Sequence, residues 1–482
     1  MKKARLTAAL LLIAMLSGCG SRENVTESTT SPGQDTREET SADTTVRDDL
    51  PDDLDFSGRE LRILTSNNTK NAVLVPEEST GVVLNDATYD LNVKICDRFG
   101  ITIAEEAITW DSARDKARNT ISAGDDAYDL ISLIDREALS FAAEKMIWYA
   151  DEVKNIDLSK PYWNQMLNEN STIGGRQVLA YSDMAMTTYD FTHVMLFNKK
   201  MVEDLQLGSP YDLISDGKWT LDKFAEYAAQ ATSDINGDGV YDDNDRYGFA
   251  SLAKQIAPCF WIGAGCVSVK KDADDLPVFD MGSERMLSVL EKAHDLTWGG
   301  KDWFVQKEGD WYSNITLFAE DQVLFCNSTF GSIFGATLRE MKSDYGIIPY
   351  PKYDEAQEKY YSRVEGGCPY SIPVTVVDTA FAGAMMEAIS CESYNSVIPA
   401  YYEVALKAKF TRDSQSGEIL DMLMQNRVYD WGDTFFCNYV RDGFVYKAFN
   451  NGNTVSASDI ESNKNAVEGA IDKTVSAIID NG

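Results

Sequence analysis

The sequence is poor in the residues that build metal centres and hydrolytic triads. It has only two histidines, His193 and His294, and none of its eight cysteines belongs to a CxxC pair. A zinc site or a Ser-His-Asp triad therefore has little to draw on. Basic residues are scarce too: 44 Lys and Arg stand against 77 Asp and Glu, a formal net charge of −33. This excess argues against nucleic acid and anionic lipid headgroups as partners.

The sequence also lacks an apolar run of the roughly 18 residues that a membrane-spanning helix needs. Its most apolar stretch, Ala8–Leu16, follows the basic residues Lys2, Lys3 and Arg5, a pattern typical of a signal peptide. It ends in Leu16-Ser17-Gly18-Cys19, which resembles a bacterial lipobox. The resemblance implies cleavage before Cys19 and acylation (palmitate) of its sulfur, so that a lipid holds the protein on the outer face of the cell membrane. A plain secretory signal is the alternative.

Residues 20–56 are rich in Ser, Thr, Asp and Glu and have few large apolar side chains. Such a segment cannot bury enough surface to fold, and we expect a disordered acidic tether. The rest of the 482 residues is too long for one ordinary core, which predicts two or more lobes.

Seven cysteines follow Cys19, an odd number that predicts mainly free thiols. Cys259 and Cys266 are close enough in sequence to be bridged, but buried free thiols are the favoured interpretation.

The first part of the folded chain alternates short apolar runs with helical patterns. The runs are Leu61–Leu64, Ile101–Ile103 and Asp129–Ile134; the helices are expected through Leu91–Phe99 and over Asp111–Ala123. This order predicts a doubly wound α/β sheet. Polar residues follow two of the runs: Asn67 after the first, Asp135 and Arg136 after the third. Open α/β sheets bind ligands at such strand ends.

The stretch Val178–Lys200 divides the chain. We expect a strand over Val178–Tyr181, a polar bend that contains Asp183, and a second strand over Val194–Phe197. A strand, a bend and a strand between two lobes indicate a hinge crossing with ligand-facing residues on the bend. An ordinary strand pair inside one domain is the alternative.

The segment Asp234–Asp245, DINGDGVYDDND, has the spacing of a calcium-binding loop. Oxygen ligands occupy alternate positions, Gly239 stands at the sixth position where the chain must turn sharply, and residue 240 offers its carbonyl. The predicted ligands are Asp234, Asn236, Asp238, Val240, Asp242 and Asp245. A structural calcium ion is the expected cofactor, and an acidic surface turn is the alternative.

The second part of the chain again mixes strands and helices. Thr220 is a suitable N-cap for a helix through Phe224 and Tyr227. Strands are expected over Gln322–Cys326 and Asp344–Pro351, a second crossing at Gly366–Tyr370, and a final amphipathic helix.

The ordered set of these segments resembles the bacterial extracellular solute-binding proteins of sugar-type ABC importers, the class that includes the maltodextrin-binding proteins. The resemblance runs from about Leu61 to the C-terminus. It is carried by four segments: Arg176–Tyr181 with Phe197–Lys199, Asp344–Ile347 with Pro349, Lys218–Thr220, and Leu317–Ala319 before Gln322. The longer bend and the calcium-type loop depart from the family pattern.

The resemblance implies an α/β, two-lobed periplasmic-binding-protein-like fold (type II), with doubly wound sheets joined by a hinge. The expected first lobe comprises residues 57–185 and 370–413, and the second comprises 190–365 and 416–482. The lobes would close on the ligand.

The expected function is capture of a carbohydrate, most simply an oligosaccharide, for delivery to ABC permease subunits by a monomeric protein that is not an enzyme. Sugar recognition requires aromatic faces for the C–H faces of the rings and planar polar groups for the hydroxyls. The aromatic candidates are Trp261, Phe330, Tyr370 and Trp431, and the polar candidates are Asn67, Asp135, Arg136 and Asp183. For each aromatic residue, core packing is the alternative.

Two other functions stay open at this point. A lipid-anchored glycoside hydrolase would require two carboxylates about 5–10 Å apart, and the many acidic residues do not exclude that pair. A glycan-binding scaffold or adhesion lipoprotein is suggested by the dockerin-like loop, although dockerins pair two such loops.

Overall fold

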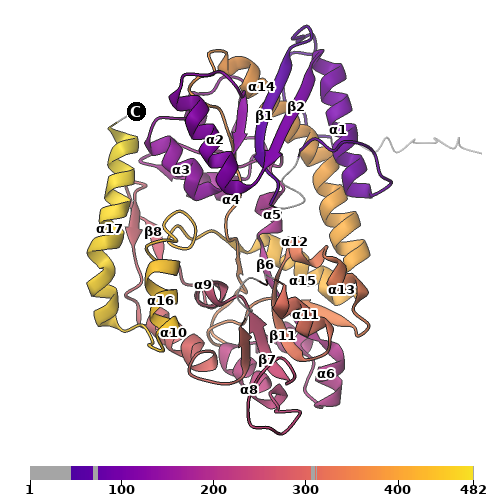
Figure 1. The fold of residues 1–482 in the computed structure, drawn as a ribbon, viewed down its shortest axis with the longest axis vertical. Coiled ribbons are helices and arrows are strands. Elements are labelled where there is room, and N and C mark those ends of the chain that lie inside the picture. The colour runs from indigo at the N-terminus through magenta and orange to yellow at the C-terminus, as the bar shows by residue number, and fades with distance from the viewer. Residues whose placement is uncertain (1–44, 69–73, 306–309, 311, 481–482) are drawn as a thin grey trace, which may run out of the picture. The chain divides into compact units, whose positions relative to one another are not determined.

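Two β-sheets organise the computed structural model, which describes residues 45–68, 74–305, 310 and 312–480. The predicted signal peptide, Cys19 and most of the predicted tether lie outside the described residues. The first sheet has the strand order β14-β3-β1-β2 and the second the order β10-β7-β11-β6-β12. Figure 1 shows the two sheets in separate lobes, here called the first and the second lobe after their sheets.

The first sheet consists of β1 (Glu60–Ser66), β2 (Thr102–Ile108), β3 (Leu130–Ser132) and β14 (Tyr370–Ser371). β1 runs parallel to both β2 and β3, and β14 is antiparallel to β3. The predicted alternation of strands and helices in this part of the chain is confirmed. The helices of the first lobe are α1 (Val83–Phe99), α2 (Trp110–Ser122), α3 (Asp135–Ala143), η2 (Ala150–Glu152), α4 (Gln165–Asn170) and, from later in the chain, α14 (Thr379–Glu392).

Helix α1 illustrates how local sequence sets these boundaries. It buries Leu91, Ile95 and Phe99, which recur at a spacing of four residues along one face. Gly100 ends the helix with a φ of 62°, in the left-handed region that glycine adopts without steric cost. Thr220 caps α8 (Leu221–Ala231) as predicted, since its side chain accepts a hydrogen bond from the Lys223 amide.

The second sheet consists of β6 (His193–Asn198), β7 (Tyr247–Ser251), β10 (Trp303–Val305), β11 (Val323–Thr329) and β12 (Tyr345–Ile348). β10, β7 and β11 are parallel, whereas β6 is antiparallel to both β11 and β12. Its helices include α5 (Thr187–Asp190), α6 (Lys199–Asp204), α7 (Pro210–Ser215), α8 (Leu221–Ala231), α9 (Ala253–Gly263), α10 (Glu284–Leu296), α11 (Ser313–Ala319), α12 (Phe330–Ile333), α13 (Ala336–Glu340) and α15 (Ser414–Gln425). Three aromatic side chains from different elements, Phe224, Phe260 and Phe325, pack together in its core.

The predicted strand at Val178–Tyr181 is absent: only the short strand β5 (Arg176–Gln177) precedes it, paired with β4 (Thr172–Ile173). The segment is buried, but side chains on and next to α4 form hydrogen bonds with its backbone N–H and C=O groups. Asn168 accepts from the Tyr181 amide at 2.6 Å, and Ser171 donates to the Leu179 carbonyl at 3.0 Å. Side chains thus replace the ladder that a strand would need.

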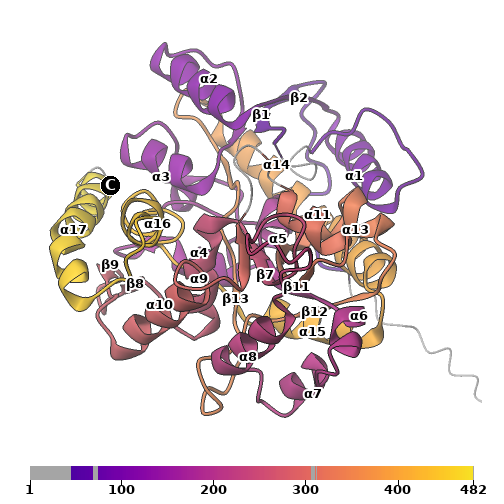
Figure 2. The same cartoon turned by 60° about the horizontal axis from the view of Figure 1, so that its bottom comes forward.

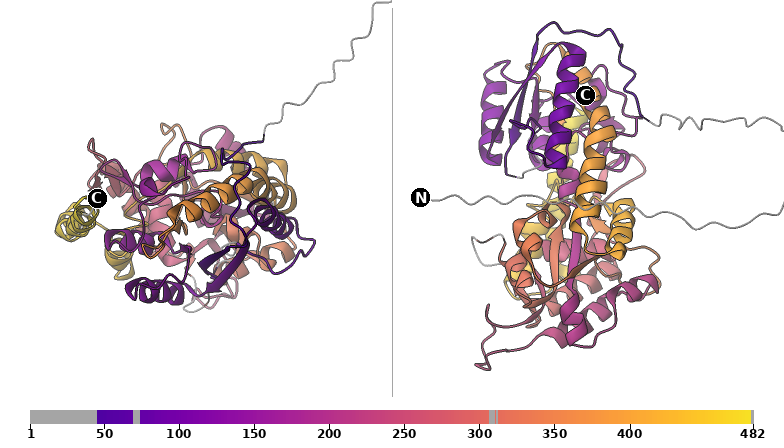
Figure 3. Two further views of the ribbon diagram at one scale, coloured as in Figure 1. Left: turned by 90° about the horizontal axis from the view of Figure 1, so that it is seen from above. Right: turned by 90° about the vertical axis from the view of Figure 1, so that its right-hand side faces the viewer.

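The chain passes between the lobes more than once. After α5 it enters β6, and later β13 (Ser362–Arg363), which pairs with β15 (Arg427–Val428), leads through residues 364–369 to β14. Helix α14 continues into the π-helical segments η3 (Ser393–Val397) and η4 (Ala400–Phe410). Figure 3, right, shows this continuous rod running from the first lobe toward the second.

The C-terminal elements are η5 (Arg441–Tyr446), α16 (Lys447–Asn450) and α17 (Ala457–Ile479). Helix α17 packs against α3 of the first lobe and also against β9 (Pro277–Phe279), as Figure 2 shows. It therefore contacts both lobes, although the sequence placed it in the second. The predicted lobe boundaries stay a prediction.

A second connection between the lobes, here called the clasp, joins the β4–β5 hairpin to the turn between β8 (Val269–Lys271) and β9. Asp275 accepts hydrogen bonds from Thr172 and from the Gly175 amide, at 3.0 and 2.9 Å. Lys271 donates to the carbonyls of Glu169 and Thr172, at 2.9 and 2.6 Å, and pairs with Asp275 at 2.8 Å.

All seven cysteines of the described chain are free, which confirms the predicted thiols. No helix of the described residues combines the length and apolar character needed to cross a membrane.

Candidate functional site

A cavity of about 820 Å³ lies where residues from both lobes and from the crossing segments meet. Its volume is within the range of small-molecule sites, about 300–1,000 Å³. It is lined by Trp110, Ile134, Asp135, Arg136, Phe191, Leu252, Ala253, Lys254, Gln255, Trp298, Trp303, Glu365, Asp433, Thr434, Cys437, Asn438, Arg441, Asp442, Tyr446 and Asn450.

The first-lobe wall is built by the starts of α2 and α3. Asp135 opens α3 just beyond β3, as expected for an α/β sheet that binds ligand at its strand ends. Its carboxylate accepts from the Tyr429 hydroxyl at 2.6 Å and from the Arg136 amide at 2.8 Å. Burial outweighs these hydrogen bonds and raises the pKa of Asp135 to about 6.

The second crossing lies directly against Asp135. The Asp135 amide donates to the Gly367 carbonyl at 3.0 Å. Gly366 has a φ of 146°, and a Cβ at this position would lie 2.5 Å from the Asp135 carboxylate. Only glycine allows the crossing to approach so closely, so this contact ties the cavity wall to the connection between the lobes.

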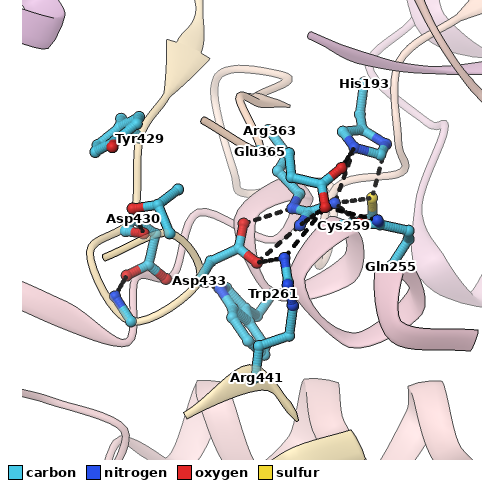
Figure 4. A network of polar contacts seen from close by, with 12 residues as sticks. His193, Gln255, Cys259, Trp261, Arg363, Glu365, Tyr429, Asp430, Asp433 and Arg441 are labelled. Atoms are coloured by element: carbon cyan, nitrogen blue, oxygen red, sulfur yellow. Dashed lines mark hydrogen bonds and ion pairs between the residues drawn. The ribbon is translucent and has the colours of Figure 1, made fainter. Parts of the chain in front are cut away.

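A network of charged residues forms the opposite wall (Figure 4). Arg363 is fully buried and binds Asp433 through two hydrogen bonds, at 2.5 and 2.8 Å. Arg441 reaches Glu365 at 3.2 Å and Asp433 at 3.3 Å. Gln255 donates to Glu365 at 2.7 Å and accepts from Arg363. These residues come from α9, β13, the second crossing and the C-terminal segment, so the network holds four parts of the chain in one arrangement.

The arginines also set the charge state of this wall. Burial alone would raise the pKa of Glu365, but the adjacent Arg363 and Arg441 hold it well below its usual range. Asp442 pairs with Arg441 at 2.8 Å and with Lys254 at 3.0 Å. The pKa of Asp442 is likewise held low by Arg441 and Lys254, so Glu365 and Asp442 are ionised at neutral pH and each lies beside a cation.

The π-helical segment η5 brings Arg441, Asp442 and Tyr446 to the cavity. Its wide turns show in two i to i+5 hydrogen bonds, from the amides of Asp442 and Val445. Gly443 is required here, because a Cβ would lie 2.1 Å from the Asn438 carbonyl.

Aromatic side chains line the cavity at two places. Trp110 and Phe191 meet edge to face, with ring centroids 6.4 Å apart. The ring centroid of Trp298 lies 4.6 Å from that of Trp303 and 6.3 Å from that of Tyr446. Such surfaces suit the C–H faces of sugar rings, and the charged side chains between them offer donors and acceptors for hydroxyl groups.

Of the eight predicted ligand residues, only Asp135 and Arg136 line the cavity. Asn67 is exposed at the end of β1, where its side chain donates to the Ala107 carbonyl. Asp183 is buried and accepts from the Tyr189 hydroxyl at 2.5 Å. The four predicted aromatic residues are all buried in the core: Trp261, Phe330, Tyr370 and Trp431.

Two of these aromatic residues, Trp261 and Trp431, also form hydrogen bonds inside the protein. Trp261 donates to Asp430 at 2.8 Å and Trp431 donates to the Asn170 carbonyl at 2.7 Å. Helix α9 begins at the cavity with Leu252–Gln255, so Trp261, two turns further on, lies deep in the second lobe. Core packing, the alternative considered from the sequence, describes all four.

Sequence reasoning missed most of the cavity. Tryptophans occur close together at Trp298, Trp303 and Trp311, but this spacing does not indicate that the first two line a cavity. The residues of 433–450 gave no signal, because their placement depends on the π-helical turn and on long-range pairing with Arg363.

The predicted calcium loop has an ordered backbone. Asp234 accepts from the amides of Gly237 and Gly239, at 2.6 and 2.8 Å. The buried Asp245 accepts from the amides of Ile235 and Asp242, at 2.8 and 3.0 Å. Across the described ranges, no three His, Cys, Asp or Glu side chains are gathered closely enough to hold a metal ion. Calcium binding stays a prediction.

Comparison with known proteins gave no match to a family model and none to a curated protein sequence. Solved structures do match. An ABC substrate-binding protein from Listeria monocytogenes in complex with cycloalternan is 12% identical, with a TM-score of 0.55, over 87% of this chain and 99% of that one. An ABC transporter solute-binding protein from Thermotoga lettingae bound with α-D-tagatose is 16% identical, with a TM-score of 0.57, over 86% and 100%.

A third similar structure is UgpB from Mycobacterium tuberculosis in complex with glycerophosphocholine. It is 14% identical, with a TM-score of 0.56, over 88% of this chain and 99% of that one. At such identities the likeness concerns the fold. The described chain therefore has the two-lobed α/β fold of the solute-binding proteins of ABC importers.

Proposed function

We propose that this protein is the substrate-binding component of an ABC importer and captures a carbohydrate, most simply an oligosaccharide, between its two lobes. The observation that carries the proposal is the cavity of about 820 Å³, which combines aromatic surfaces with paired charges and takes residues from both lobes. The solved sugar complexes with the same fold support this choice of ligand class. Permease subunits would be the protein partner.

A ligand that touches both walls binds the closed arrangement better and shifts the population toward it. The full-length purified protein should therefore show a raised melting temperature with one or more members of an oligosaccharide panel. Small-angle scattering should show a smaller radius of gyration at saturation. If no carbohydrate in the panel binds while glycerophosphocholine or an amino acid does, the ligand class is wrong.

Two tryptophan variants distinguish a side chain that lines the cavity from one that is packed in the core. Trp303→Ala should weaken binding of the selected oligosaccharide by about 5–30-fold, through loss of a stacking face worth roughly 1–2 kcal/mol. Trp261→Ala removes a fully buried side chain and should instead lower stability by roughly 3–5 kcal/mol. Melting and affinity measured on both variants distinguish the two outcomes.

A lipid-anchored glycoside hydrolase is the competing function. It would form products from the bound glycan, whereas an importer's binding protein releases the glycan unchanged. Chromatography of the glycan after prolonged incubation with the wild type tests this directly, and product formation would contradict the transport proposal.

A further inference from the structure

The charged residues that line the cavity differ in how fully they are engaged. On the second-lobe side, Glu365, Asp433 and Asp442 are all matched by Lys254, Arg363 and Arg441. The carboxylates and the two arginines among them are bonded to one another, and Lys254, which is 51% exposed, donates to Asp442 at 3.0 Å. The wall is thus preformed, and a ligand gains few new charged hydrogen bonds there without breaking existing ones.

Arg136 is the exception on the opposite wall. Its guanidinium donates no hydrogen bond to any described residue, and its one ion pair among them is a long contact of 3.8 Å with Glu137. The side chain is 34% exposed and lines the cavity. Its planar fork of N–H groups therefore stays available for paired oxygen atoms of a ligand.

The charge balance decides which oxygen atoms fit. On the second-lobe wall, Lys254, Arg363 and Arg441 pair with Glu365, Asp433 and Asp442. Arg136 already has two anions beside it: Glu137 at 3.8 Å, and Asp135, whose pKa of about 6 leaves it ionised at neutral pH. A carboxylate on the ligand would add an unmatched negative charge beside Asp135 in a partly dehydrated site, which is costly. Two hydroxyl oxygens of a neutral sugar accept the same hydrogen bonds without that charge.

We propose that Arg136 determines ligand specificity by binding two neighbouring hydroxyl oxygens of a neutral sugar through two of its N–H groups. The inference rests on the proposed carbohydrate function and adds to it a class of ligand, neutral rather than uronate-bearing, and a residue that reads it. Because the carboxylates and arginines of the second-lobe wall are already bonded to one another, Arg136 contributes a large share of the hydrogen bonding that is gained on binding.

The test begins with the full-length wild type on a printed array of neutral and uronate-bearing oligosaccharides. Titration calorimetry then measures the best neutral glycan and its monodeoxy derivatives, which each lack one hydroxyl. We expect Arg136→Met to weaken binding of the parent glycan by about 10–100-fold. Arg136→Lys keeps the charge but loses the fork, and should fall between the wild type and Arg136→Met.

The deoxy series shows whether the contact is direct. For the wild type, one or two monodeoxy derivatives should bind about tenfold or more weakly than the parent glycan. For Arg136→Met the same derivatives should bind as the parent does, because the partner of the missing hydroxyl is gone. Arg285→Met is the matched control: this arginine is 40% exposed, makes one ion pair at 4.0 Å and lies outside the cavity. It should change neither affinity nor discrimination.

Each other outcome has a distinct meaning. Binding to no glycan on the array contradicts the proposed function and the inference with it. Tighter binding of uronate glycans overturns the neutral class while carbohydrate binding stands. Equal affinity of Arg136→Met and wild type overturns the role of Arg136 alone. If Arg136→Met does not fold, the Arg136→Lys series decides the question in the same way.

Discussion

Several buried carboxylic acids hold their protons more tightly than free ones, and Asp183 is the clearest. It is 4% exposed, accepts a hydrogen bond from Tyr189, and has a pKa raised by burial to about 7. An unfolded aspartate titrates near about 3.9. The folded state therefore binds more protons between about pH 4 and pH 7, and stability falls as pH rises through this window.

Replacement of Asp183 by asparagine should remove this dependence. The amide oxygen still accepts the Tyr189 hydrogen bond but carries no charge to bury. We expect Asp183→Asn to be more stable than the wild type at pH 8, by roughly 1–3 kcal/mol, and the difference to shrink toward pH 5. Chemical denaturation at several pH values measures it. A constant difference across pH would show that Asp183 is ionised in the folded protein.

The sequence predicted correctly the residues whose role depends on their neighbours in the chain. It did not predict those whose position depends on tertiary packing. Thr220 was identified as a helix N-cap, because a cap depends only on the residues next to it in the sequence. Trp261 was placed wrongly, since nothing nearby in the sequence tells that α9 meets the cavity end-on. Asp135 and Arg136 were found because they follow a strand of a doubly wound pattern.

At the scale of elements, the clasp can be tested with two neighbouring lysines of β8, one of which serves as the control. Lys271 is half-buried and bonds across to the β4–β5 hairpin, whereas its neighbour Lys270 makes a solvent-exposed ion pair with Asp280 at 2.8 Å. Lys271→Met removes the donor to the carbonyls of Glu169 and Thr172 and the cation that pairs with Asp275. It should lower stability by roughly 1–3 kcal/mol. Lys270→Met should cost at most about 1 kcal/mol.

Thermal melts of the two lysine variants check the size of the effect. Hydrogen exchange at the Gly174 and Gly175 amides, which donate to the backbone and side chain of Asp275, checks its place. Faster exchange at these amides in Lys271→Met alone is expected. The same losses in both variants would mean that the clasp does not hold the hairpins together.

The loop Asp234–Asp245 carries the calcium proposal, which rests on its ligand spacing. Its carboxylates already accept loop amides, so they are oriented before any ion arrives. Extracellular calcium modules have dissociation constants near ~10⁻⁴–10⁻³ M, and a tenfold excess of calcium adds roughly 1.4 kcal/mol. EDTA should lower the melting temperature of the wild type and hardly affect Asp234→Ala. Equal responses in both proteins would count against the ion.

The sequence reading of elements was strongest where periodicity was long. Helix α17 and the strands β1, β6 and β11 follow from their patterns alone. Val178–Tyr181 looked equally strand-like, yet Asn168 and Ser171 took over its backbone hydrogen bonds. Tertiary partners of this kind are invisible in a one-dimensional pattern.

For the molecule as a whole, the proposed importer function is joined by a second proposal, attachment to the membrane by a lipid at Cys19. Its basis is the motif Leu16-Ser17-Gly18-Cys19. Cys19→Ser should leave the protein unprocessed or release it into the medium. Fractionation and mass spectrometry test this, and a variant that still carries lipid and sediments with membranes would refute the motif.

The seven free thiols have a consequence for how such a protein is made. They are buried or half-buried, and none is joined to another. The described fold therefore needs no thiol oxidase or disulfide isomerase in the compartment where it matures. Folding in an anaerobic or reducing environment would yield the same native state, and expression in a reducing cytosol should do so equally well.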